Sequence, residues 1–269
     1  MATKKILLNG PEIDVANAFF GGGAGGMARN MAQYLGAYES DEFEQVPCFH
    51  SVRKEKAGPL SFVKRLVTDT AAVVRGAPSA DGVHIVAQYR TAIYREFAIM
   101  LVCLAWRRPV LYEIKAGAFI QWLGSCRSWE RWMALFILRH ARVVLCEGRV
   151  YVRFLQDELG IESHYAPNFV LGQEIPGDIQ PKLMREQVRV LFVGYCYEGK
   201  GVFELVEGCE LAAQQGVAVE LTLAGHEDED FTRFLDEKIS QGLSLTVKRM
   251  GRMNHADVLE LFKANDVFC

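Results

Sequence analysis

The sequence lacks an apolar run long enough to cross a membrane. The longest uncharged run, "FAIMLVCLAW" at residues 97–106, is about half the roughly 20 residues that a spanning helix needs, so it predicts a buried helix. The opening residues, "MATKKILLNG", hold only a short apolar segment, and no small-residue cleavage site follows them. They predict a first strand rather than a signal peptide, and a cytoplasmic protein.

The sequence also lacks the spacings of cysteine and histidine that mark metal sites. Its seven cysteines form no C-x-x-C pair, which argues against a zinc site and a disulfide framework and is typical of reduced, buried thiols. The six histidines are scattered singly. Only His226, which follows Gly225 in a loop after a predicted strand, is expected near a binding site.

Apolar, β-rich segments alternate with helical patterns along the chain, which predicts parallel sheets covered by helices on both faces. The expected fold class is α/β, with two Rossmann-like domains. The predicted strands are residues 4–10, 82–89, 109–117, 141–148, 188–195, 218–225, 245–251 and 265–269. The predicted helices are residues 26–37, 60–75, 92–107, 127–140, 148–158, 201–215, 229–240 and 255–264.

One stretch marks the expected boundary between the domains. Residues 166–187, "APNFVLGQEIPGDIQPKLMREQ", are rich in Pro, Gly and Gln and show no clear period. The net charge changes sign there, from +4 over residues 1–170 to −7 over residues 171–269. We predict an N-terminal domain at 1–170 and a C-terminal domain at 171–269, with the ligand in a cleft at the carboxyl ends of their strands.

Five glycines fall within residues 21–26, directly before a predicted helix. Gly21, Gly23 and Gly26 fit the dinucleotide pattern G-x-G-x-x-G, but that pattern needs its first glycine in the turn after strand one, and here ten residues intervene. Two interpretations stay open. The loop is either an anion site made of backbone N–H groups and the helix dipole, or a surface loop with no ligand.

A second loop favours the anion site. The stretch "VRVLFVGYCYEGKGVFELVEG", residues 188–208, predicts a strand, a loop with Gly194, Lys200 and Gly201, and a helix. Lys200 and a helix N-terminus would then lie at the carboxyl edge of the second sheet, and two such helix starts can hold one diphosphate. The alternative is that Lys200 is an ordinary solvated lysine.

Five stretches in order resemble the motifs of retaining glycosyltransferases of the GT-B fold, in particular glycosyltransferase family 4. They are "GGMARNMAQYL" (25–35), "YAPNFV" (165–170), "FVGYCYEGKGVFELVEG" (192–208), "LTLAGHEDED" (221–230) and "VKRMGRMNHADVLELFKANDVFC" (247–269). The resemblance implies transfer of a sugar, with retention, from a nucleotide-sugar donor to a saccharide or lipid-linked acceptor in surface polysaccharide or glycolipid synthesis. It implies no metal and no cofactor.

The resemblance also implies roles for individual residues. Lys200 would neutralise the charge that develops on the leaving nucleoside diphosphate, a task that falls to cations and helix N-termini where no metal is used. Gly251 to Met253 would meet the nucleobase. The implied donor-binding residues are Gly25, Gly26, Gly194, Lys200, Gly225, Gly251 and Met253.

Two positions depart from the family's pattern. Tyr195 stands where the family commonly has a phosphate-binding arginine, and Arg29 on the first helix is a conjectural substitute. Lys115, in "YEIKAGAF", stands where the family often has a catalytic-site histidine. Lys115 would hydrogen-bond a sugar or phosphate, with Glu113 on the same face of the strand, or both are structural. The predicted catalytic residues are Lys115 and Lys200.

The chain ends at Cys269, before the E-x7-E segment with which the family holds the donor's sugar and ribose. We expect a truncated chain with an incomplete second domain and an exposed strand edge at residues 266–269. Such a chain would bind nucleotide weakly and catalyse transfer poorly or not at all.

Residues 89–142 carry nine Lys and Arg against three Glu, interleaved with four tryptophans. One interpretation is an acceptor-side contact with anionic lipid at the inner face of a membrane, through Arg127, Trp129, Arg131 and Trp132. The alternative, which the pattern favours, is a core helix with its arginines in solvent. No nucleic-acid motif accompanies the charge, so nucleic acid is not an expected partner.

Three functions stay open on the sequence. The first is the glycosyltransferase. The second is a nucleotide-sugar epimerase of the same two-domain shape, which would need acid/base carboxylates or a histidine that the sequence does not locate. The third is a truncated or degenerate chain that binds nucleotide or membrane without turnover.

Overall fold

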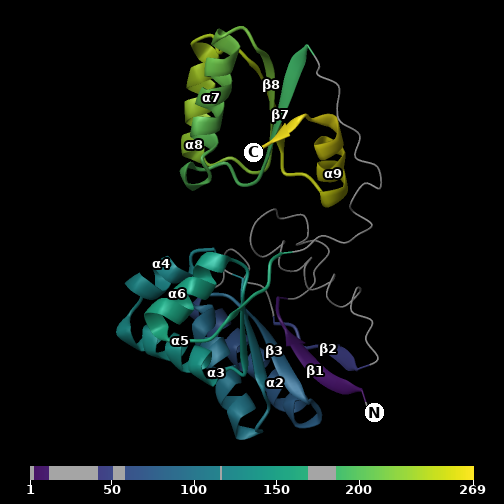
Figure 1. Ribbon diagram of the computed structural model, residues 1–269, viewed down its shortest axis with the longest axis vertical. Coiled ribbons are helices and arrows are strands. Elements are labelled where there is room, and N and C mark those ends of the chain that lie inside the picture. Colours follow the sequence, from purple (N-terminus) through teal and green to yellow (C-terminus); the bar gives the residue numbers. More distant parts are fainter. Residues whose placement is uncertain (1–2, 12–41, 51–57, 116, 169–185) are drawn as a thin grey trace. The chain divides into compact units, whose positions relative to one another are not determined.

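The computed structural model describes residues 3–11, 42–50, 58–115, 117–168 and 186–269, which are coloured in Figure 1. These residues fall into two compact units, one over 3–168 and the other over 186–269. The predicted domain boundary after residue 170 and the predicted helix at 26–37 lie outside the described residues, so both stay predictions.

The first unit is built on a six-stranded sheet whose neighbouring strands are all parallel. In spatial order the strands are β2 (Phe43–Pro47), β1 (Lys4–Asn9), β3 (Gly82–Ala87), β4 (Val110–Ile114), β5 (Val143–Cys146) and β6 (His164–Tyr165). The central four match predicted strands. The edge strands β2 and β6 were not predicted, because "FEQVP" and "HY" lack the apolar run that identifies a buried strand.

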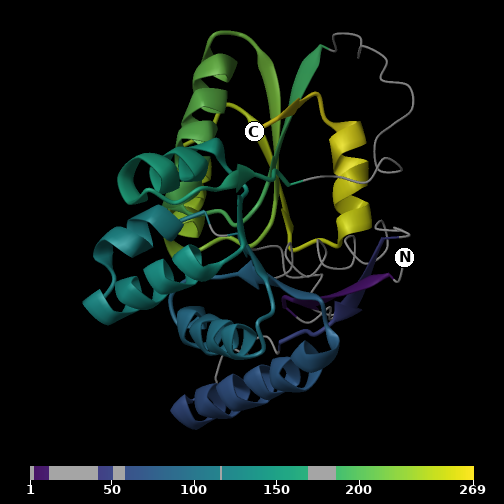
Figure 2. The same cartoon turned by 60° about the horizontal axis from the view of Figure 1, so that its bottom comes forward.

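Helices cover one face of this sheet over a single large core. They are α2 (Pro59–Gly76), α3 (Ala92–Ala105), α4 (Phe119–Ser125), α5 (Ser128–His140) and α6 (Arg149–Leu159), with a 3-10 turn η2 (Ala77–Ser79) after α2. Alternate strand residues such as Ile85 and Tyr112 pack with Ile99 of α3 and Ile137 of α5. Figure 2 shows α2 and α3 side by side, and α5 packs against α3. The residues between these strand positions therefore face away from the helices.

Helix α3 corrects the prediction of a buried helix at 97–106. Ile99, Met100 and Cys103 are buried, but Leu101 and Leu104 are 45% and 38% exposed. Apolar residues on both sides of a helix suggest full burial, and here only one side meets the sheet. Within the described ranges, no helix has both the length and the apolar character needed to cross a bilayer.

The second unit is a four-stranded parallel sheet in the spatial order β10-β7-β8-β9. Its strands are β7 (Gln187–Val193), β8 (Ala218–Ala224), β9 (Thr246–Gly251) and β10 (Val267–Phe268), and each was predicted. The helices α7 (Val202–Gln214), α8 (Glu229–Ser240) and α9 (His255–Ala264) were also predicted, whereas the 3-10 turn η4 (Glu198–Lys200) was not. Figure 1 shows α7 and α8 on one face of the sheet and α9 on the other.

Residues at helical spacing build the core of the second unit. Val202 and Val206 of α7 and Phe231 and Leu235 of α8 are completely buried together with Leu221 of β8. Helix α8 begins at an N-cap carboxylate, because Asp228 accepts a hydrogen bond of 2.8 Å from the backbone N–H of Phe231. The loop that precedes α8 is thereby fixed at the carboxyl end of β8.

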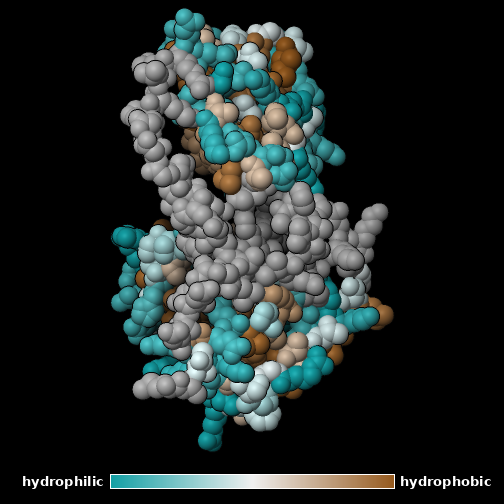
Figure 3. Space-filling view, turned by 90° about the vertical axis from the view of Figure 1, so that its right-hand side faces the viewer, coloured by the Kyte–Doolittle hydropathy of each residue, from teal (hydrophilic) through white to brown (hydrophobic). Residues whose placement is uncertain are grey.

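Strand β10 lies at an edge of its sheet, as predicted for residues 266–269. Val267 and Phe268 are 44% and 57% exposed. Phe262 of α9 packs edge-on against Phe268, with ring centroids 4.8 Å apart. The face of this unit seen in Figure 3 carries hydrophobic residues in small groups among hydrophilic ones.

Candidate functional site

Three neighbouring strands of the second unit end on glycine. Gly194 follows β7, Gly225 follows β8, and Gly251 is the last residue of β9. The backbone N–H of Gly194 donates to Ala224 O at 3.0 Å, and that of Gly225 donates to Gly251 O at 2.8 Å. The three predicted glycines therefore form one continuous, hydrogen-bonded edge of backbone.

Gly225 is required at this edge by the close approach of two strand ends. A Cβ atom placed on Gly225 would lie 1.6 Å from the carbonyl oxygen of Gly194, far inside van der Waals contact. Gly251 has a φ of 64°, a left-handed conformation that glycine adopts without strain. The edge thus consists of backbone groups that carry no side chains of their own.

An aromatic pair stands beside the glycines. Tyr195 and His226 stack with ring centroids 5.2 Å apart and ring planes 11° apart, and Tyr195 is 40% exposed. Their loops are held together, because Cys196 N–H donates to His226 O at 2.8 Å and Asp228 N–H donates to Cys196 O at 3.0 Å. Tyr195, which departs from the arginine of the family pattern, therefore offers a flat ring surface in place of a cation.

Lys200 lies in the turn η4, directly before α7. Gly201, with a φ of 68°, is the N-cap residue of α7, and no side chain caps this end. Lys200 is exposed to solvent. An exposed ammonium next to an uncapped helix N-terminus suits an anionic group.

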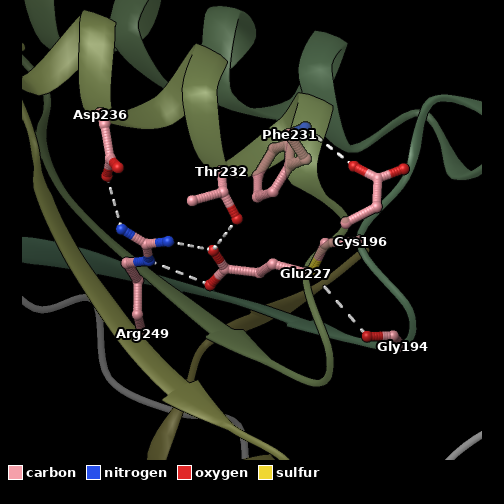
Figure 4. Close-up of polar contacts among 8 residues, drawn as sticks. Gly194, Cys196, Glu227, Phe231, Thr232, Asp236 and Arg249 are labelled. Atoms are coloured by element: carbon pink, nitrogen blue, oxygen red, sulfur yellow. Dashed lines mark hydrogen bonds and ion pairs between the residues drawn. The ribbon is translucent and has the colours of Figure 1, made fainter.

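A cluster of charged side chains supports the loop after β8 (Figure 4). Arg249 of β9 binds both carboxylate oxygens of Glu227 and donates to Asp236 of α8 at 2.7 Å. The hydrogen bond to Glu227 raises the pKa of Arg249. Burial raises the pKa of the Cys196 thiol to about 12, so it is protonated at neutral pH. This cluster is structural support that fixes the loop of His226 between β9 and α8.

Lys115 lies at the end of β4 in the first unit and is buried. Its ammonium donates to Asn168 Oδ1 at 2.8 Å and lies 3.2 Å from Glu113 Oε1. Asn168, which follows β6, in turn donates to Glu147 Oε2 at 3.3 Å. Glu113 and Lys115 thus share one face of the strand, as predicted, and they also form an ion pair. Asn168 and Glu147 extend this network along the carboxyl ends of β5 and β6.

His84 is a member of this network that the sequence did not reveal. Its Nε2 lies 2.9 Å from Glu113 Oε2, so the two oxygens of Glu113 face His84 and Lys115 separately. Burial pushes the pKa of Glu113 upward, but the hydrogen bonds and charges of His84 and Lys115 outweigh burial and leave that pKa below its ordinary value. The contact depends on how β3 pairs with β4, with His84 opposite Leu111, two residues before Glu113. The sequence alone does not give this strand register, so it could not predict the contact.

The other predicted site residues lie elsewhere. Gly25, Gly26 and Arg29 are outside the described residues. Met253 follows β9 and is partly buried. Arg127, Trp129, Arg131 and Trp132 are exposed at and just before α5, a helix that packs on the sheet face opposite Glu113. The structure therefore does not bring these four to Lys115.

Two solved structures share the fold of this chain. Anabaena Alr3699/HepE in complex with UDP and glucose matches with a TM-score of 0.62 and 16% identity, over 98% of this chain and 73% of that one. The apo form of the lipopolysaccharide outer core galactosyltransferase WaaB matches with a TM-score of 0.53 and 14% identity, over 98% and 72%. No protein-family model and no curated protein sequence matches the chain. At these identities the likeness shows the α/β GT-B fold with its Rossmann-like units.

Replacing Gly225 by alanine is expected to lower the free energy of unfolding by about 3 kcal/mol, because the new methyl group overlaps Gly194 O. Gly194→Ala is the matched control, since a Cβ there meets only the Phe192 ring at 3.4 Å, an ordinary contact. The free energy of unfolding of Gly194→Ala should fall by no more than about 1 kcal/mol. Urea unfolding measures both, and equal losses would contradict the close approach.

Replacing Glu113 by glutamine is expected to lower the free energy of unfolding by about 3–5 kcal/mol, because it leaves the ammonium of Lys115 buried without its carboxylate. Glu44→Gln is the control, since Glu44 meets Lys5 at 3.8 Å with both side chains more than half exposed. It should cost less than about 1 kcal/mol. Denaturant unfolding of both variants at neutral pH measures the difference.

The pH dependence of the Glu113 effect follows from its lowered pKa. A carboxylate whose pKa is lower in the folded than in the unfolded state stabilises the fold above the ordinary pKa of 4.5 and loses that contribution as the pH falls below it. The difference in free energy of unfolding between the parent chain and Glu113→Gln should therefore become smaller below pH 4.5. A difference in free energy of unfolding that grows in acid would contradict a lowered pKa of Glu113.

Proposed function

We propose that the chain is a glycosyltransferase that takes a sugar from a nucleotide-sugar donor. The observation that carries this proposal is the glycine edge of the second unit, Gly194, Gly225 and Gly251, where the loop from Gly194 leads through Lys200 into the start of α7. Ligands of parallel α/β sheets bind at the carboxyl ends of strands, and a bare backbone edge allows a phosphate to approach closely. The shared fold with HepE, solved with UDP and glucose, supports the same assignment.

The donor's diphosphate is proposed to lie at the glycine edge, with Lys200 compensating the charge that it gains as it leaves. Stabilising this charge is the main electrostatic task in such a transfer, and cations and helix N-termini perform it without a metal. The backbone from Gly251 to Met253 is proposed to meet the nucleobase. Within the described ranges, no three His, Cys, Asp or Glu side chains are grouped so that they could hold a metal ion.

Lys115 is proposed to contact a sugar or a phosphate in the first unit. A buried ammonium held by Glu113 and Asn168 has a defined position, and preorganised donors are more effective than mobile ones because they need no reorganisation during the reaction. The acceptor class, saccharide or lipid-linked, the retention of configuration and a role in polysaccharide or glycolipid synthesis belong to the same proposal. They rest on the resemblance of the sequence motifs.

A second candidate function is nucleotide binding without turnover. Tyr195 favours it, because an exposed tyrosine stacked on His226 supplies no positive charge where the family pattern has arginine. Release of nucleoside diphosphate from UDP-, GDP- and ADP-sugars, with saccharide and lipid-linked acceptors present, separates the two. Binding without release would favour this second function.

Thermal unfolding with UDP, GDP, ADP, CMP and NAD tests the donor site. A ligand at about 100 times its dissociation constant adds about 2.7 kcal/mol, or about 5–10 °C in Tm for a chain of this size. We expect a shift with one nucleoside diphosphate and its reduction in Lys200→Ala. Lys263→Ala, which removes a lysine 64% exposed on α9, is the control and should keep the full shift.

A shift with NAD alone, or an identical shift in Lys200→Ala and in the parent chain, would contradict the proposed donor site. The first outcome would favour a dinucleotide enzyme, and the second would mean that Lys200 is an ordinary surface lysine.

A further inference from the structure

The outer surface of the helix layer in the first unit is apolar over several turns. Val63 and Val67 of α2 are 54% and 61% exposed, and Leu101 of α3 is 45% exposed. Trp129 and Trp132 of α5 are 52% and 57% exposed. These residues lie on the side of the helices that faces away from the sheet. We call this surface the outer helix face.

Ring contacts show that the outer helix face is continuous between α3 and α5. Trp132 packs against Phe97 of α3 at 5.4 Å between ring centroids and against Phe136 at 5.6 Å. One turn earlier on both helices, Trp129 Nε1 donates to the hydroxyl of Tyr94 at 3.3 Å. The helices therefore run side by side in the same direction, and Leu101 and Leu104 extend the aromatic row toward their carboxyl ends.

The acidic side chains of these three helices are buried or hydrogen-bonded. Asp69 of α2 is 8% exposed and Glu96 of α3 is completely buried, and both act electrostatically on Arg95, whose side chain is 12% exposed. Glu130 of α5 binds the Tyr94 hydroxyl and the backbone N–H of Arg127. No other Asp or Glu occurs on α2, α3 or α5. The outer helix face thus shows no freely solvated carboxylate from these helices.

The basic side chains of the same layer are mostly exposed. Arg127 and Arg131 lie at the first turn of α5, and Arg139 lies in its last turn. Arg107 follows α3, next to Trp106, which is 49% exposed. The guanidinium of Arg127 lies 5.0 Å from the ring centre of Trp129. The apolar row is therefore bordered by positive charge at both ends.

We propose that the outer helix face docks onto the surface of an anionic phospholipid bilayer. Leucine and tryptophan side chains enter the boundary between headgroups and acyl chains, while arginines at the rim pair with lipid phosphates. A second copy of the chain is disfavoured as the occupant, because a symmetric contact would bring like charges together. Nucleic acid would neutralise the arginines but would leave Leu101 and Leu104 without an apolar partner. The proposal is independent of the donor site in the second unit.

Sedimentation of the full chain with vesicles tests the proposal. We expect binding to vesicles of equal parts phosphatidylglycerol and phosphatidylcholine, weak binding to phosphatidylcholine alone, and release by salt. Arg107→Gln with Arg139→Gln should lower the partition coefficient about 25-fold, because each basic residue near an anionic surface contributes about fivefold. Arg233→Gln with Lys263→Gln, both exposed in the second unit, is the matched charge control and should change little.

A second pair of variants tests the apolar part. Leu101→Ser with Leu104→Ser should also lose binding, whereas Leu211→Ser with Ile239→Ser, exposed apolar residues of the second unit, should keep it. Both pairs remove exposed side chains, and melting curves check that each variant is folded. Equal binding by test and control variants would overturn the proposal. So would equal binding to neutral and anionic vesicles, a dimer that dissociates in Leu101→Ser with Leu104→Ser, or binding to nucleic acid but not to vesicles.

Discussion

The carboxylate of Glu113 is the charge on which the polar side of the first unit depends. It is 1% exposed, and a carboxylate at such a site stays ionised only if partners replace the lost water. His84 approaches one oxygen and Lys115 the other, so one side chain of β4 binds both β3 and the end of its own strand. Lys115 then reaches Asn168 beyond β6. A single buried charge thereby sets the positions of groups from three separate strands.

In the second unit the strand ends approach each other because they are glycines, which have no side chains. Gly194 and Gly225 approach so closely that no Cβ fits between them, and the charges that stabilise this region, Glu227 and Arg249, lie to one side of the glycine edge. One unit therefore offers a fixed cation and the other offers a bare backbone. In the proposed function, both would hold an anionic or hydroxylated ligand at the carboxyl ends of parallel strands.

The sequence predicted the elements of the fold better than the contacts at the sites. Strands such as β7 and β8 are rich in apolar residues and are followed by glycine, and helices such as α8 begin at a capping aspartate, so local chemistry identifies them. The partnership of His84 with Glu113 depends on strand register, which arises only when β3 and β4 pair. Tertiary packing also decided the outcome for "FAIMLVCLAW", which was predicted to be a buried helix. Its composition does not reveal that only one side of α3 meets the sheet.

All four tryptophans of the chain, at positions 106, 122, 129 and 132, belong to the first unit. Three of them are about half exposed, and the second unit contains none. Tryptophan fluorescence, excited at wavelengths where tyrosine does not absorb, therefore comes from the first unit and not from the glycine edge with its Tyr195. Tryptophan emission and circular dichroism of the same unlabelled chain would follow different parts of the molecule, so a difference between the two melting curves would reveal that the units unfold separately.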